Sequence, residues 1–301
     1  MTELIDLHSG ALRLAIAPAV GGAVAAFERD GVPLFRATSP EALAAGEVRD
    51  FSCYPLVPFS NRIAGAELNF AGKTHVLRRY LPGDPSAIHG NGWQRAWQVL
   101  AARRSRASID LVHDAKGART REWPFPYRAR QEFVLLAHGL KMTLAIANTG
   151  TKPFPCGLGW HPFFPRTADT ELSFTAKAMW ETDATKLPTR LRRIKPTHYF
   201  SVPRPLGKTV LDNCFAGWRP PVLIRWPERR MQMAIFANEP CRHLVVYVPS
   251  GADYFAAEPV SHMTDAFNRA ASGVTDITGT RLLAPGETFS CTMHASLRHP
   301  I

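Results

Sequence analysis

Five apolar residues alternate with polar residues near the end of the chain: Phe289, Cys291, Met293, Ala295 and Leu297. A period of two is typical of a β-strand with one buried face. Shorter versions of this pattern recur along the chain, whereas no long segment has the 3.6-residue period of an amphipathic helix. The sequence therefore favours folds that are built from packed sheets.

Further strand patterns occur throughout the chain. They cover residues 12–16, 24–27, 68–76 as a hairpin, 109–111, 131–137, 140–146, 172–174, 222–226, 231–236 and 243–248. The segment 40–47 is rich in Ala and Glu and is expected to form one or two helical turns, or a loop. The 25 prolines exceed an ordinary usage of ~5% and argue against a helical bundle. Without a βαβ rhythm or a repeat, the sequence predicts an all-β fold, a large β-sandwich forming a single domain over residues 1–301.

The ends and the cysteines of the chain bear on its compartment. The N-terminus has no basic segment followed by an apolar core, and no apolar run approaches the ~18 residues of a membrane span. We therefore expect a cytoplasmic protein that does not bind membranes. The cysteines are odd in number and none forms a Cys-x-x-Cys pair, which favours reduced, buried thiols over disulfides or a zinc site. They are Cys53, Cys156, Cys214, Cys241 and Cys291.

The formal net charge of +11 raises the possibility of nucleic-acid binding. Basic residues cluster near positions 103–106, 190–195 and 225–230, but no recognised nucleic-acid-binding motif accompanies them. Solvated faces, with one edge that attracts anions, are the preferred interpretation. We expect no nucleic-acid partner.

One histidine stands out in the run from Gly157 to Pro165. His161 lies among large apolar residues and directly precedes Pro162, so it is expected in extended backbone with its imidazole projecting from a strand. The glycines ahead of it let backbone or ligand come close. Apolar walls around one titratable group are typical of a small-molecule pocket. A buried histidine bonded to a carbonyl is the alternative.

Glu258 has a similar setting. It follows apolar residues near the end of an expected strand and precedes Pro259. A carboxylate in such a place is costly unless it is paired or used in chemistry. A purely structural role is therefore less favoured for Glu258 than for His161.

Two further segments carry candidate ligands. Residues 51–63 form an apolar run whose two prolines argue against a central strand. This run ends in Asn61-Arg62, where a guanidinium could bind a polar ligand or could hold the loop through backbone carbonyls. The second segment is 88–93, in which His89 lies next to glycine. Its aromatic neighbours Trp93 and Trp97 could stack on a sugar or could belong to the core.

Five motifs in this order resemble the aldose 1-epimerase (galactose mutarotase) family. They are Asn61-Arg62-Ile63, His89-Gly90, Gly159-Trp160-His161-Pro162-Phe163-Phe164, Leu211-Asp212-Asn213-Cys214-Phe215 and Glu258-Pro259. Family members commonly have Tyr where this chain has Phe163. The resemblance implies a galactose mutarotase-like β-supersandwich. It also implies a hexose pocket formed by Arg62, His89, His161, Asp212 and Glu258, with Asn61 and Trp160 as further substrate contacts. By itself, Asp212-Asn213 is typical of a turn.

Exchanging α and β anomers requires one base and one acid. The base deprotonates the C1 hydroxyl while the acid protonates the ring oxygen, on opposite sides of the C1–O5 edge. Glu258 as carboxylate and His161 as imidazolium suit these roles. His89 would assist near the ring oxygen, and Arg62 and Asp212 would bind hydroxyls through charge-assisted bonds. We expect a monosaccharide substrate, no metal or other cofactor, and a monomer or homodimer.

Several alternatives remain open. A hexose-6-phosphate mutarotase would suit the net charge, although two carboxylates near the sugar would repel a phosphate. A glycoside hydrolase could use Asp212 and Glu258, but His161 would then have no task. A sugar-binding protein without turnover is a further possibility. A metal site from His89, His161 and Glu258 is conceivable, but it lacks the His-x-His spacing that would favour it.

Overall fold

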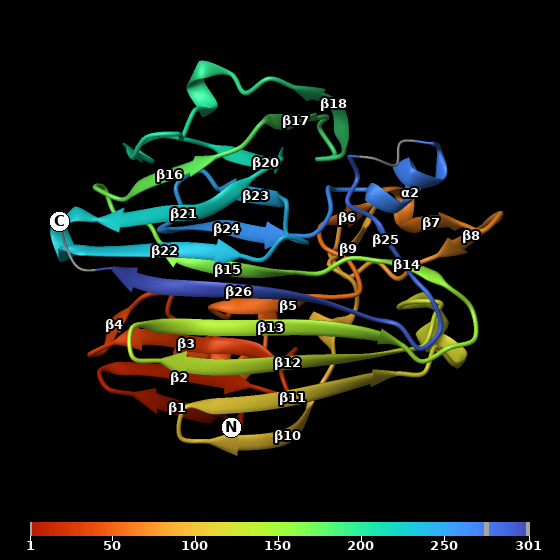
Figure 1. Cartoon of the computed structure of the whole chain (residues 1–301), viewed down its shortest axis with the longest axis horizontal. Coiled ribbons are helices and arrows are strands. Elements are labelled where there is room, and N and C mark those ends of the chain that lie inside the picture. Colours follow the sequence, from red (N-terminus) through yellow and green to blue (C-terminus); the bar gives the residue numbers. More distant parts are fainter. Residues whose placement is uncertain (1, 274–276, 299–301) are drawn as a thin grey trace.

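A computed structural model describes residues 2–273 and 277–298 and contains two large antiparallel sheets (Figure 1). The eleven-stranded sheet consists of β1 (Ile5–Ser9), β2 (Leu12–Ala17), β3 (Ala23–Arg29), β4 (Val32–Pro33), β5 (Cys53–Leu56), β15 (Gly159–Pro165), β17 (Ala178–Thr182), β18 (Pro188–Arg192), β20 (Leu211–Ala216), β23 (His243–Val248) and β24 (Tyr254–Val260). The nine-stranded sheet consists of β10 (Gln98–Arg103), β11 (Arg106–His113), β12 (Tyr127–Leu136), β13 (Gly139–Asn148), β16 (Glu171–Thr175), β19 (Arg204–Pro205), β21 (Arg219–Trp226), β22 (Met231–Ala237) and β26 (Thr288–Arg298).

The remaining elements are short. Three two-stranded ribbons pair β6 (Arg62–Ile63) with β9 (Ala87–Ile88), β7 (Glu67–Phe70) with β8 (Lys73–Val76), and β14 (Phe154–Cys156) with β25 (Arg281–Leu283). The α-helices are α1 (Pro40–Ala45) and α2 (Ala266–Ala271). The 3-10 turns are Val48–Asp50, Ala64–Ala66, Gly92–Gln94, Gly117–Arg121, Pro196–His198 and Pro227–Arg229. The predicted all-β sandwich is confirmed.

The short helix α1 forms where the sequence left a helix or a loop open. Ser39 caps it, because its hydroxyl oxygen accepts a hydrogen bond from the Ala42 N–H, and Pro40 occupies the first helical position. Gly46 then ends the helix in the left-handed conformation with φ of 66°. Strong signals at both ends therefore compensate for the short length.

The nine-stranded sheet is regular at its centre. Strands β12 and β13 pair without a shift from Tyr127 opposite Asn148 to Leu136 opposite Gly139. Buried and exposed residues alternate along β12, as the sequence pattern predicts. β26 lies between β13 and β22 and carries the strict C-terminal alternation, so the last strand of the chain completes the middle of this sheet.

The eleven-stranded sheet differs from two expectations. β5 contains Pro55 yet lies between β3 and β15 in the interior of the sheet, so the expectation of a non-central segment was wrong. It tolerates proline because it is short and pairs with β3 at a single position, Val24 opposite Cys53. Asp212 and Asn213 lie within strand β20 and not in a turn, because the pairing of Leu211–Ala216 with β23 overrides their local preference.

Buried apolar side chains of both sheets form one hydrophobic core cluster. All five cysteines are unpaired and buried, as expected. Within the described residues, no helix is both long and apolar enough to cross a membrane.

Candidate active site

The candidate site lies on five neighbouring strands of the eleven-stranded sheet, in the order β5, β15, β24, β23 and β20. On β15, His161 is paired with Tyr54 of β5. The pairs Gly159–Val260 and Phe163–Ala256 lie on either side of His161 and set it opposite Glu258 of β24. Strand register thus makes neighbours of two residues that are far apart in the sequence.

Prolines interrupt the β15–β24 ladder at this point. Backbone pairs are present at Gly159 and from Phe163 to Pro165, with a gap between them. Pro162 and Pro259, which follow the two ionisable residues, have no N–H to donate to a ladder. The same prolines that predicted extended backbone therefore open the sheet where His161 and Glu258 meet.

The imidazole and the carboxylate are in direct contact. His161 Nε2 lies 3.3 Å from Glu258 Oε1. Both residues are buried, with exposed fractions of 7% and 2%. The two groups adjoin in the wall of the cavity, whereas acid and base were expected on opposite sides of the sugar's C1–O5 edge, and that expectation stays a prediction. The second carboxylate oxygen of Glu258, Oε2, is buried and makes no hydrogen bond within the described chain.

Burial shifts the two groups in opposite directions. It raises the pKa of Glu258 well above the usual value, and the nearby Asp212 carboxylate raises this pKa further. Burial lowers the pKa of His161 to about 3, and the positive charge of Arg36 contributes. Low polarity disfavours both charged forms. Burial therefore favours the neutral form of each group, a carboxyl for Glu258 and an imidazole for His161.

His89 is held in one tautomer by the loop that carries Asn61. The backbone N–H of Asn61 donates to the ring nitrogen Nδ1 of His89 at 3.0 Å. In return, the backbone N–H of His89 donates to the Asn61 carbonyl at 2.9 Å. Since Nδ1 accepts, the neutral ring carries its proton on Nε2. Burial lowers the pKa of His89 well below its usual value and favours the neutral ring, whose Nε2–H is the available donor. Both residues have left-handed backbone, with φ of 60° for His89 and 55° for Asn61, a strain that often marks functional sites.

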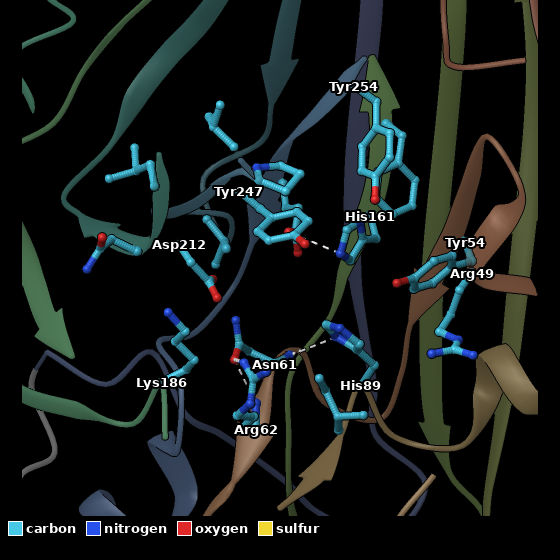
Figure 2. Close-up of a pocket in the computed structure, with 18 of the residues that line it drawn as sticks. Arg49, Tyr54, Asn61, Arg62, His89, His161, Lys186, Asp212, Tyr247 and Tyr254 are labelled. Atoms are coloured by element: carbon cyan, nitrogen blue, oxygen red, sulfur yellow. Dashed lines mark hydrogen bonds and ion pairs between the residues drawn. The ribbon is translucent and has the colours of Figure 1, made fainter. Parts of the chain in front are cut away.

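Arg62 and Asp212 lie at the opposite side of the cavity from Tyr54 (Figure 2). Arg62 Nε donates to Asp84 at 2.9 Å, and a terminal nitrogen of Arg62 lies 3.4 Å from Asn61 Oδ1. The guanidinium is thus fixed mainly by a carboxylate, not by backbone carbonyls as the alternative supposed. Burial raises the pKa of Asp212, while the positive charges of Arg62 and Lys186 oppose this increase.

These residues surround a cavity of about 840 Å³. The cavity lies within the range of roughly 300–1,000 Å³ that is typical of small-molecule sites. Its wall contains more charged residues than the sequence indicated. The cations are Arg36, Arg49, Arg62 and Lys186, and the carboxylates are Asp50, Asp212 and Glu258. Five aromatic residues, Tyr54, Trp93, Phe163, Tyr247 and Tyr254, also line it.

Sequence reasoning missed the three extra cations because each stands alone in a loop or turn. Lys186, for example, lies in the turn between β17 and β18 and has a φ of 66°. No local pattern distinguishes such a residue from other surface lysines. Tyr54 could have been identified from the sequence, because it lies in the segment 51–63 that was expected to carry candidate ligands.

The tryptophans divide between cavity and core. Trp160 was predicted to contact the substrate, but it is 1% exposed and is not among the cavity residues, so this prediction was wrong. Successive residues of a strand point to opposite faces, and His161 takes the cavity face. Trp93 lines the cavity and stacks with Tyr54 at 5.6 Å. Trp97 belongs to the core.

The glycines before His161 allow close approach by protein, not by ligand. A Cβ on Gly157 would lie 1.8 Å from the His262 ring. His262 Nε2 accepts a hydrogen bond from the Ser60 N–H at 3.0 Å. This packing supports the loop that carries Asn61 and Arg62. Over residues 2–273 and 277–298, His, Cys and carboxylate side chains nowhere gather in a group of three that could hold a metal ion.

Comparisons with known proteins extend this description. A family model described as "Aldose 1-epimerase" matches residues 3–296. The uncharacterized protein YphB of Escherichia coli (strain K12) is 32% identical over 303 residues, covering 98% of each chain. A crystal structure from Escherichia coli K12, provisionally called an aldose 1-epimerase, has a TM-score of 0.88 at 28% identity and covers 99% of each chain. A galactose mutarotase-like protein from Clostridium acetobutylicum shares the fold, with a TM-score of 0.87 at 16% identity, covering 98% of this chain and 95% of that one.

The family model spans nearly the whole chain, and the motifs that suggested the resemblance converge on one cavity. The protein belongs to the aldose 1-epimerase family.

Proposed function

We propose that this protein interconverts the α and β anomers of a free aldohexose, with Glu258 as base and His161 as acid. The observation that carries the proposal is the 3.3 Å contact between His161 Nε2 and Glu258 Oε1 inside the cavity. One proton donor and one acceptor side by side match O1 and O5, which are bonded to the same carbon. Family membership supports this class of reaction.

In the ring-opening step, Glu258 removes the proton from the C1 hydroxyl. The O–H electron pair forms the C1=O1 double bond, and the C1–O5 bond breaks. The electron pair released on O5 takes a proton from His161 and becomes the C5 hydroxyl. Rotation about C1–C2 followed by the reverse transfers closes the ring on the other face and returns both protons.

Before each ring opening, the pair must hold one proton more than a carboxylate beside a neutral imidazole. This proton lies either on Glu258 or on His161, and the pair is then in its one-proton state. The neutral form favoured by burial and the reactive carboxylate–imidazolium form contain the same number of protons. The 3.3 Å contact is short enough for the proton to move between the two groups once they align. An imidazolium whose pKa is lowered is also a stronger acid toward the ring oxygen.

The neighbouring polar residues then bind and orient the sugar. The Nε2–H of His89 would donate to a sugar oxygen, since its Nδ1 is occupied by Asn61. Arg62 and Asp212 would bind hydroxyls from the other side of the cavity. The buried, unpartnered Oε2 of Glu258 is available to accept a hydrogen bond from the C1 hydroxyl.

A phosphorylated aldose is a second candidate substrate, because Arg36, Arg49 and Lys186 join Arg62 on the cavity wall. Two of these four cations already have partners, since Arg49 pairs with Glu47 and Arg62 with Asp84. Three carboxylates on the same wall would also repel a phosphate. A neutral aldose is therefore the first choice.

Anomer exchange measured by NMR tests the proposal. Glucose, galactose, other free aldoses and glucose 6-phosphate would be compared, with the uncatalysed exchange subtracted. We expect catalysed exchange on at least one free aldose, with higher kcat/KM than on glucose 6-phosphate. A preference for the phosphate would establish the second candidate. Sugar binding without catalysed exchange would instead indicate a non-catalytic binding protein.

A further inference from the structure

Arg36 is rigidly fixed at the edge of the cavity. It lies between β4 and α1, and its backbone N–H donates to the Phe163 carbonyl at 2.8 Å. Its guanidinium carbon lies 4.1 Å from the centre of the Phe163 ring and 4.5 Å from that of Tyr254. One terminal nitrogen donates to the carbonyls of Arg49 and Phe51 at 2.7 and 2.9 Å. Aromatic rings and backbone oxygens therefore hold this charge in place.

Among the described residues, no carboxylate forms a direct ion pair with Arg36, although Asp50 and Asp253 act on its charge from a greater distance. Arg49 and Arg62, on the same wall, each pair with a carboxylate. Arg36 forms no ion pair among the described residues, and its Nε is buried without a hydrogen-bond partner. Removing a cation from water without compensation costs free energy. Such a residue in a cleft is a candidate for a functional role.

Phe163 brings Arg36 next to the acid. The Phe163 ring centre is 4.4 Å from that of His161 and 4.1 Å from the Arg36 guanidinium carbon. Tyr54 lies against the imidazole from its own strand, with ring centres 4.8 Å apart. The only charged group in this aromatic cluster is the guanidinium. A fixed positive charge at this place opposes the binding of a second proton by the neighbouring pair.

We propose that Arg36 is a positioning residue that holds the Glu258–His161 pair in its one-proton state by placing a fixed positive charge, engaged in no direct ion pair among the described residues, beside the imidazole. This inference rests on the proposed function, because the one-proton state is the form competent for anomer exchange. Without Arg36, the pair would take up a second proton at higher pH, and the acidic limb of the activity profile would move upward. Arg36 thus extends the working range of the enzyme toward low pH.

Other groups that face the pair act on it as well. They are Cys53 and Tyr54 on β5, Arg62 on β6, His89 after β9, Asp212 and Cys214 on β20 and Tyr247 on β23, while Asp50, Asp253, Tyr54 and Tyr254 act on Arg36. Among the charges, Arg36 is the one that contributes to lowering the pKa of His161, after burial itself. Its removal should therefore be visible on His161 directly.

The test combines the pH profile of kcat/KM with an NMR titration of the His161 ring. Arg36→Gln keeps a hydrogen-bond donor but removes the charge. It should move the acidic limb of the profile and the His161 titration upward by on the order of one pH unit. Arg36→Lys keeps the charge and should remain near wild type in both measurements.

Arg204→Gln is the matched control. Arg204 also stacks on an aromatic ring, 4.5 Å from the centre of Phe200, and donates to a backbone carbonyl, but it does not line the cavity. It should shift neither measurement. If Arg36→Gln fails to fold, Arg36→Met, which keeps the apolar stem, provides the same comparison.

The outcomes separate this inference from the proposed function. An upward shift in the NMR titration without any anomer exchange would support the electrostatic role while refuting the reaction. Catalysed exchange with both measurements unchanged in Arg36→Gln would overturn the inference. An equal shift in Arg36→Lys would also overturn it, because geometry and not charge would then be responsible.

Discussion

The two large sheets differ in how completely their polar groups are paired. Around β11, β12, β13 and β26 the ladders are long, and β12 and β13 pair from end to end. These four strands contain no buried side-chain polar atom without a partner among the described residues. In the other sheet, β15 and β24 pair with a gap, and both His161 and Glu258 keep an unpartnered buried atom there.

This difference indicates a division of labour. Regular ladders bury apolar faces and satisfy their own hydrogen bonds, which stabilises the fold. The interrupted ladder leaves polar groups unsatisfied at a cost in stability, and such groups are free to bind a substrate. Substitutions in the two sheets should therefore affect different quantities.

Substitutions at the interrupted β15–β24 ladder should have the largest effect on activity. Glu258→Gln preserves shape but removes the base, so kcat should fall by about 10²–10⁴, or about 3–5 kcal/mol of barrier. His161→Gln should lose a similar factor. The unfolding temperature should stay within about 3 °C of wild type in both variants. Calorimetry and NMR anomer exchange measure the two quantities.

The double variant sharpens this test. Groups that serve one transition state act as a unit, so the double loss should be smaller than the product of the single losses. Wild-type exchange rates in either folded single variant would remove Glu258 or His161 from the proposed chemistry.

The regular sheet should show the opposite behaviour. Leu144 on β13 is fully buried, with an exposed fraction of 0%. Leu144→Ala should lower the free energy of unfolding by about 2–5 kcal/mol, because it removes buried methyl groups and leaves a cavity. Denaturant titration measures this loss, and kcat per folded molecule should be unchanged. A large drop in kcat at full folding would contradict the division between the sheets.

Arg62 should affect binding more than turnover. Its guanidinium faces the cavity while Asp84 fixes it, so it would hold sugar hydroxyls equally in the ground and transition states. Arg62→Ala should raise KM by about 10- to 100-fold, corresponding to about 1.5–3 kcal/mol, with a smaller change in kcat. Steady-state kinetics provide the measurement. If the variant instead unfolds while its folded fraction binds sugar normally, Arg62 is a loop anchor.

The carboxyl of Glu258 should make a smaller, pH-dependent contribution to stability. Its pKa is raised in the folded state, so folding binds a proton between the unfolded pKa of about 4.3 and the higher folded value. This contribution to stability is complete below the unfolded pKa and decreases as pH rises through the folded pKa. Glu258→Gln should match wild type near pH 4 and exceed its unfolding temperature by on the order of 2 °C at pH 8. A difference that is constant with pH would refute this.

Removing metal ions by chelation should change neither the activity at the interrupted ladder nor the stability of the regular sheet. The proposed proton transfers use only side chains and leave no step for an ion. Dialysis against EDTA should therefore leave both the anomer-exchange rate and the unfolding temperature unchanged. A loss of activity that Zn²⁺ or Mn²⁺ restores would instead favour the metal-site alternative.

Much of the fold could be predicted from the sequence because strand periodicity is local. Alternation over a few residues indicated β12, β13, β22 and β26. The extended backbone of His161 and Glu258 followed from the prolines behind them. The exceptions were β5 and β20, where pairing with neighbouring strands overrode the preferences of Pro55, Asp212 and Asn213.

The sequence by itself determined the class of fold and the two ionisable residues most worth examining. Tertiary structure decided that His161 adjoins Glu258, that Trp160 points into the core, and that Arg36 brings an unpaired charge to the cavity. The physical reason is that periodicity arises within one strand. A contact across strands depends on sheet order and register, which are set by the packing of the whole chain.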